Sequence, residues 1–133
     1  MSKEQDHIWW FGRGEEYLRM AAGELARQML QSSLSHLQHA AEFFFKAAIR
    51  FHSGDHPHIR NPYTLLHICR LYLPAVDSIF PRNSLEEILL FSLLNPYRFI
   101  PAGAAQPSLH TIAKLHKRVT QLKNLIKQQF PPS

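Results

Sequence analysis

The stretch LSHLQHAAEFFFKAAIRF, residues 34–51, decides the fold of this chain. Read as a helix, it places apolar side chains on one broad face, at spacings of three and four residues. They are Leu34, Leu37, Ala41, Phe44, Phe45 and Ala48. Small alanines alternate with a run of phenylalanines, so a neighbouring helix can approach closely and interdigitate. The stretch therefore predicts a central core helix.

Polar residues on the same helix raise the question of function. Glu42 precedes Lys46 by four residues, the favourable order for an ion pair, which contributes roughly 0.2–0.5 kcal/mol on an exposed surface. His36, His39 and Arg50 also lie outside the apolar face. These five side chains are candidates for lining a site.

Composition indicates one helical, globular domain. A chain of 133 residues can form a core without disulfides or metals, and a hydrophobic content of 45% argues against disorder over most of its length. Only 5 glycines are present, and Val and Thr are rare, whereas Leu, Ala, Gln, Glu, Lys and Arg dominate, which favours helix. The formal net charge of +5 is compatible with RNA, a nucleotide or an acidic partner, but requires none of them.

Several classes of protein are excluded. Cys69 is the single cysteine, so there is no internal disulfide or cysteine-based zinc site; its apolar helical context predicts a buried, unreactive thiol. No glycine-rich phosphate loop or GxSxG motif occurs, and no cofactor is expected. No apolar stretch reaches membrane-spanning length, and the N-terminus lacks a basic-then-apolar signal arrangement. We therefore expect a soluble cytoplasmic protein.

The first helix is predicted from about His7 to Gln31. Gly12 and Gly14 weaken its first turns, so a start at Glu15 is the alternative. A polar break of three serines between residues 32 and 35 follows, and any of these serines can cap the central helix.

Three further helices are expected after the central one, which Gly54 ends. Asn61 is the predicted N-cap of the third helix, and Pro74 stops that helix. SLEE, residues 84–87, is a capping box ahead of the apolar run 88–94. Residues 97–107 are expected to form a loop.

Ser108 is the predicted N-cap of the last helix, whose apolar residues step by three and four. They are Ile112, Leu115, Val119, Leu122 and Ile126. The whole pattern predicts an all-α fold, an antiparallel bundle of about five helices with short connections. We expect a single domain over residues 1–133, with a core at about 8–128 and a frayed tail at 129–133.

One segment resembles a known signature. HAAEFFFKAA, residues 39–48, is similar to the QAAEKALKAL pattern of HEPN domains, the higher eukaryotes and prokaryotes nucleotide-binding helical bundles. Glu42, Lys46 and Ala47 match the Glu, the Lys and the Ala of that pattern. The resemblance covers roughly residues 8–128, and implies a small stand-alone member with a four-helix up-and-down core.

Two later stretches fit the same family. NPYTLL, residues 61–66, stands where HEPN domains usually carry THDL, with Thr64 in place of a histidine. YRFIP, residues 97–101, stands where many members have RYP, with Ile100 as an extra residue.

The resemblance implies a nucleotide- or RNA-binding module, and pairing with a minimal nucleotidyltransferase in a two-component, toxin–antitoxin-like system is one role that it suggests. The nucleotide or phosphate contacts would then be His39, Glu42, Lys46 and Arg98. For Arg98, a salt bridge at the end of the bundle is the alternative.

The family also includes metal-independent RNases with an Arg-x(4–6)-His motif. Arg60 and His67, with six residues between them, match it. In such an enzyme the guanidinium stabilises the phosphorane charge and the imidazole moves a proton. Here the pair spans a loop and the start of the third helix, whereas the family motif usually lies later. A structural or incidental pair is therefore the alternative.

Two sets of side chains have metal-binding chemistry. They are His52, Asp55, His56 and His58 around the loop, and His36, His39 and Glu42 on the central helix. Histidines on a loop without cysteines are usually solvated, and no matching Glu-x-x-His motif faces the helical set. No metal site is predicted.

The leading hypothesis is thus a HEPN-like binding module that forms a homodimer. The dimer rests partly on the resemblance and partly on aromatic residues that one small bundle cannot easily hide, Trp9, Trp10, Tyr72 and Tyr97. The second hypothesis is an RNase toxin that uses Arg60 and His67, and the third is a structural or adaptor bundle without a ligand.

Overall fold

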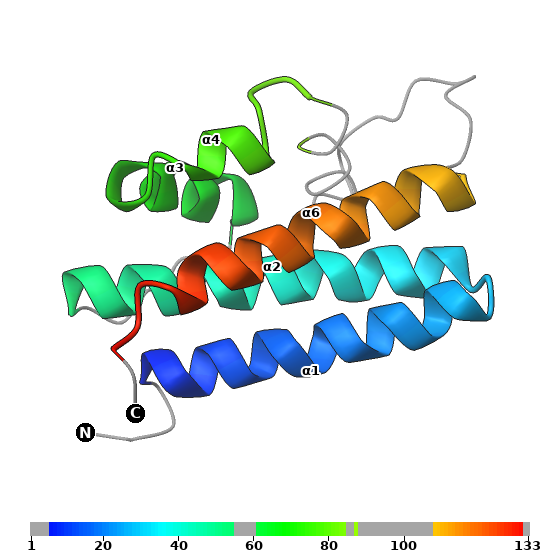
Figure 1. Cartoon of the computed structure of the whole chain (residues 1–133), viewed down its shortest axis with the longest axis horizontal. Helices are drawn as coiled ribbons and strands as arrows, with labels where there is room; N and C mark the ends of the chain where they lie inside the picture. Colours follow the sequence, from blue (N-terminus) through cyan, green and yellow to red (C-terminus); the bar gives the residue numbers. More distant parts are fainter. Residues whose placement is uncertain (1–5, 55–60, 85–86, 88–107, 132–133) are drawn as a thin grey trace.

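The computed structural model describes residues 6–54, 61–84, 87 and 108–131, and each element that it assigns there is a helix. The helices are α1 (His7–Ala26), α2 (Leu30–Ser53), α3 (Pro62–Tyr72), α4 (Val76–Ile79) and α6 (Leu109–Lys127). α1 and α2 form an antiparallel hairpin, and α6 lies along it in the direction of α2, with α3 and α4 beside them (Figure 1). The predicted all-α bundle is confirmed. None of the described helices is long and apolar enough to span a membrane.

α2 is the central helix, as predicted. The six residues of its predicted apolar face are all buried, none more than 3% exposed. α2 packs against α1, α3 and α6, so every major helix of the described chain meets it. Gly54 follows its last turn with φ 76°, the left-handed conformation that favours glycine.

Gly14 has a packing role that the sequence did not reveal. α1 begins at His7 and continues through both Gly12 and Gly14, so the alternative start at Glu15 is wrong. A Cβ on Gly14 would lie 2.6 Å from Cδ1 of Phe44, which is fully buried. The glycine therefore makes room for the Phe44 ring between α1 and α2.

The turn between α1 and α2 comes earlier than predicted. α1 ends at Ala26, and α2 begins at Leu30 with Met29 as its N-cap and no side-chain cap bond, so both the extension to Gln31 and the serine cap are wrong. Ser33 lies inside the helix, where its buried hydroxyl donates a hydrogen bond to the Ala21 carbonyl at 2.8 Å. The serine links the two helices instead of starting one.

Two predicted caps are confirmed. The Asn61 side chain accepts a hydrogen bond from the Tyr63 amide at 2.9 Å, which caps α3. The Ser108 hydroxyl accepts from the Thr111 amide at 3.2 Å, which caps α6. The five predicted core residues of α6 are buried, at most 1% exposed.

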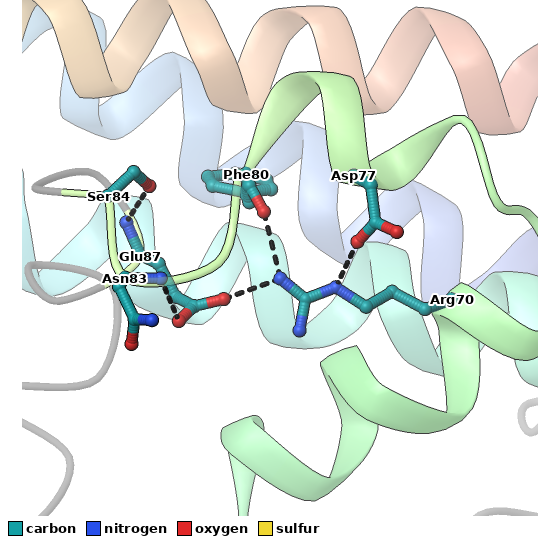
Figure 2. A network of polar contacts seen from close by, with 6 residues as sticks. All are labelled: Arg70, Asp77, Phe80, Asn83, Ser84 and Glu87. Atoms are coloured by element: carbon teal, nitrogen blue, oxygen red, sulfur yellow. Dashed lines mark hydrogen bonds and ion pairs between the residues drawn. The ribbon is translucent and has the colours of Figure 1, made fainter.

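α4 is a short helix that was not predicted, and Arg70 ties it to α3. Arg70 Nε lies 2.6 Å from the Asp77 carboxylate, and Nη2 donates to the Phe80 carbonyl at 2.8 Å and to Glu87 at 2.5 Å (Figure 2). The Arg70 and Glu87 side chains are only 6% and 8% exposed. Burial of both charges is tolerated because each has charged and hydrogen-bonding partners.

The predicted capping box is half formed. The Glu87 amide donates to the Ser84 hydroxyl at 3.2 Å, as a capping box requires. The Glu87 carboxylate accepts from the Asn83 amide at 3.1 Å and is shared with Arg70, so it serves the ionic network as well as the cap. The expected helix over 88–94 and loop over 97–107 lie outside the described residues.

Phe130, which follows α6, contacts three rings at the start of α1 and the end of α2. Phe130 packs on the core, and its ring centroid lies 5.4 Å from Phe11, 5.1 Å from Phe51 and 4.7 Å from His7. This ring joins the start of α1, the end of α2 and the end of α6 at one end of the bundle.

Candidate functional site

A row of stacked rings runs along one side of the α1–α2 hairpin. Phe43 stacks on Trp10 with ring centroids 5.4 Å apart, and on Tyr17 at 5.5 Å with planes only 5° apart. Tyr17 also lies 5.7 Å from the His36 ring and 5.3 Å from the His39 ring. We call these five side chains the ring row. Trp10 is buried and the other four are partly exposed, so part of the row is accessible to a ligand.

Helical periodicity explains why these rings align. On α2, His36, His39 and Phe43 recur at three and four residues and therefore share a face. On α1, Trp10 and Tyr17 are seven residues apart, about two turns. Two antiparallel helices with matched rows bring the rings into one ladder.

The ring row faces away from α6. On α1, Glu15 points toward α6, because its carboxylate lies 3.7 Å from Lys123 Nζ. Tyr17 lies two residues further along α1, which rotates it roughly 160° around the helix axis from Glu15. Among the described helices, α1 contacts only α2 and α6 extensively, so no described helix packs over the α1 side of the row.

Two cations lie over the rings. The Arg13 guanidinium carbon is 5.3 Å from the Tyr17 centroid and 6.0 Å from that of Phe43. The Lys46 ammonium is 5.0 Å from the Trp10 centroid and 5.6 Å from that of Phe43. Such contacts are attractive because the ring face carries partial negative charge.

The two cations differ in how free they are. Lys46 lies 3.1 Å from Glu42, and the two side chains are 9% and 15% exposed, so the predicted pair forms and is largely buried. Arg13 is more accessible, with 37% of its side chain exposed, although it pairs with Glu16 at 2.7 Å. Glu42 and Lys46 therefore pack against the rings from the buried side, whereas Arg13 can reach a ligand.

His36 is held by a charged partner across the hairpin. Its Nδ1 lies 2.5 Å from the Glu24 carboxylate, and the two side chains are 23% and 11% exposed. Glu24 comes from the last turn of α1, so this contact fastens the end of the ring row. His39 has no such carboxylate partner within the described part of the chain, and rests against Tyr17.

Of the predicted binding residues, the structure gathers His39, Glu42 and Lys46 along one side of α2, beside α1. Arg98 lies outside the described residues. Of the predicted catalytic pair, His67 is exposed on α3 and Arg60 lies outside the described residues. Their proximity stays a prediction.

Sequence reasoning missed the α1 half of this surface. Arg13 and Tyr17 follow one another at four residues, and Glu24 comes seven residues after Tyr17, so all three fall on one side of α1. That spacing was a usable signal. What the sequence did not give is the pairing of this side with His36 to Phe43 on α2, which depends on the register of the hairpin.

Other candidate chemistry finds no support in the described ranges. No three His, Cys, Asp or Glu side chains gather there as a metal site, while Asp55, His56 and His58 lie outside those ranges. Cys69 is fully buried, and burial raises the pKa of its thiol to about 12 against the opposing influence of Arg70. The predicted burial of the thiol is confirmed, and a raised pKa disfavours the reactive thiolate.

Comparison with known families gives one match. The family model described as the HEPN domain matches residues 8–102, more than half of the chain. Neither a search of curated proteins nor a search of solved structures finds a match. The family match supports a nucleotide- or RNA-related helical module.

Proposed function

The chain belongs to the HEPN domain family, and from this premise we propose that it binds a nucleotide or single-stranded RNA on the ring row. The observation that supports this most is the stacked series from Trp10 through Phe43 and Tyr17 to the two histidines, with Arg13 beside it.

The chemistry of the row suits unpaired bases. Bases stack on aromatic side chains and on guanidinium planes, and this stacking tolerates any sequence because each base has a π-face. Tyr17 and His39 are partly exposed, so the edge of the row can receive a base. Arg13 lies close enough to Tyr17 to meet a phosphate attached to that base.

Glu42 and Lys46 have a supporting role in this proposal. The buried pair holds Lys46 over Trp10 and Phe43, which fixes the position of the rings. His39 contacts the base, and Arg98 remains a proposed phosphate contact.

Two substitutions test the binding face. Tyr17→Ala removes a stacking platform worth about 1–3 kcal/mol per base, so we expect the Kd for a labelled single-stranded RNA to rise roughly 5- to 150-fold. Arg13→Gln removes a phosphate contact, and should lower the slope of log Kd against log salt by about 1. Fluorescence anisotropy across a salt series measures both.

Arg118→Gln is the matched control, since it removes the same charge from α6, where Arg118 contacts Gln121. The proposal fails if wild-type protein binds neither RNA nor nucleotides, or if Arg118→Gln weakens binding as much as Arg13→Gln. Thermal unfolding of each variant separates a lost contact from a lost fold, because a true ligand raises the Tm of wild type.

The proposal extends to the setting of the protein. The module is cytoplasmic, forms a homodimer and pairs with a minimal nucleotidyltransferase in a toxin–antitoxin-like system. Co-purification with such an enzyme supports the pairing; independent migration of the two proteins at micromolar concentration rejects it.

A metal-independent RNase is the second candidate, favoured by one observation: His67 is exposed on α3 and can reach a substrate. In this enzyme His67 transfers a proton and Arg60 stabilises the phosphorane. Arg60→Ala and His67→Ala would each abolish RNA cleavage and cell toxicity. If both variants cleave RNA as wild type does, the RNase hypothesis is wrong.

A further inference from the structure

We propose that the outward face of α1 is the surface on which a second copy of this chain docks, with the two α1 helices antiparallel about a two-fold axis. The inference rests on the homodimer proposed above, but not on RNA binding. It names the surface, the register and the residues that meet.

Exposed apolar side chains mark this face. Ile8 is 67% exposed, Trp9 39% and Met20 48%, although all three lie on a helix that also packs against α2 and α6. Trp10, in contrast, is 8% exposed, so the two tryptophans face different sides and Trp10 is not available to a partner. Large apolar residues gathered on one side of a surface helix mark an interaction site.

Two glycines lie on the same side of the helix. Gly12 and Gly23 have open space where a Cβ would be, so packing within this chain does not require them. A glycine in a helix costs about 1 kcal/mol relative to alanine. The two positions are eleven residues apart, about three turns, and therefore point in nearly the same direction.

An antiparallel pair of α1 helices puts these features in register. If Gly12 of one copy faces Gly23 of the other, the two-fold axis crosses the helix pair at the level of the Tyr17–Leu18 peptide bond. The two α1 backbones can then approach closely at two points. Glu16 then faces Arg19 of the other copy. Both side chains are exposed and opposite in charge, so the face is complementary to itself.

Apolar contacts flank the central charges in this register. Trp9 of one copy meets the stretch near Ala26 of the other, and Ile8 lies against the aliphatic part of Arg27, all of which are exposed in the single chain. The apolar ends and the charged centre fit a second copy of the same helix, which is the occupant we commit to.

Disulfide trapping tests the register in the full-length protein. One tagged chain carries Gly12→Cys and a co-expressed chain with a different tag carries Gly23→Cys. The purified protein is then oxidised. We expect a cross-linked dimer of the two different chains. Gly12→Cys alone should not cross-link, because its thiols would lie roughly 16 Å apart along the helices, beyond disulfide reach. Wild type, whose Cys69 is buried, is the blank.

Charge reversal provides a second readout by sedimentation equilibrium. Glu16→Arg and Arg19→Glu each place like charges face to face, and should raise the dimer Kd about tenfold or more; the double variant should recover the wild-type Kd. Glu16→Gln controls for loss of the internal pair with Arg13.

Each outcome decides something. Cross-linking of the mixed chains with recovery in the double variant supports the surface. A dimer that cross-links through Gly12→Cys alone, or through Leu71→Cys on the exposed side of α3, overturns it and leaves the homodimer in place. A monomer at every concentration overturns both. RNA binding is not part of the readout, so the ring-row proposal is judged separately.

Discussion

Gly14 and Phe44 show how one residue's meaning depends on a contact with another helix. Read alone, a glycine near the start of a helix weakens it, so a later start at Glu15 was the alternative to His7. In the structure the missing side chain is what the buried Phe44 ring requires. That requirement arises from packing between helices, and no local pattern encodes it.

Replacement of Gly14 tests this directly. Gly14→Ala places a Cβ 2.6 Å from a ring that cannot easily move, so we expect a loss of about 1–3 kcal/mol in the free energy of unfolding. Gly12→Ala, with open space around it within the chain, should be neutral or gain up to about 1 kcal/mol when measured below the dimer Kd. Urea unfolding measures both. If both glycines respond alike, Gly14 has no special packing role.

His116 on α6 makes the free energy of unfolding depend on pH. Its Nε2 is buried without a hydrogen-bond partner in the described part of the chain, and burial lowers its pKa below the ordinary 6.5. The unfolded chain therefore binds the proton more readily, so this contribution to stability is present above about pH 6.5 and declines as pH falls through the folded pKa.

His116→Gln tests the direction of this pH dependence. Urea midpoints between pH 7.5 and 5 should fall less steeply in this variant than in wild type, because glutamine does not titrate in this range. An equal or steeper fall in the variant would contradict a lowered pKa.

At the scale of elements, Arg70 fixes α4 against α3. The apolar pattern and Pro74 predicted where α3 ends, but α4 was missed because four residues carry too little periodicity to read. Residues 84–87 alone predicted the capping box. They did not predict the ion pair of Glu87 with Arg70, because Arg70 lies 17 residues away in the sequence.

Loss of Arg70 should be severe. Arg70→Leu leaves the buried Glu87 carboxylate without its cation, and we expect a loss of about 3–5 kcal/mol in unfolding free energy. Asp77→Asn is the control, since that carboxylate is 50% exposed and its pair should contribute less than about 1 kcal/mol. Equal losses in the two variants would mean that burial of the ion pair does not determine the loss of unfolding free energy. Arg70→Leu with Glu87→Leu should recover part of the loss.

The ring row also belongs to this scale. Glu42 and Lys46 on α2 match the family signature, which also contains the position of His39, whereas Arg13 and Tyr17 on α1 lie outside it. Each helix carries its half of the row in its own spacing, but only the register of the hairpin joins the halves. The sequence of either helix alone therefore predicts only half of a site that lies between them.

For the molecule as a whole, the fold was predictable because helix propensity and apolar spacing agree, and the caps at Asn61 and Ser108 agree with both. The central face of α2 and the core of α6 were read correctly from periodicity alone. The surface was less predictable, since exposed side chains obey no packing rule that a single sequence reveals. Ring row and α1 face are both surface features that depend on which helices pack together.

Photo-cross-linking locates bound RNA on the protein and so tests whether the ring row is the binding site. Single-stranded RNA that contains 4-thiouridine is cross-linked to the protein by light, and the modified peptides are mapped. We expect modification in α1 and α2 at the ring row, on Tyr17 or Phe43, and its loss when unlabelled RNA competes. Cross-links confined to α3 around His67 would contradict the ring-row site and favour the RNase.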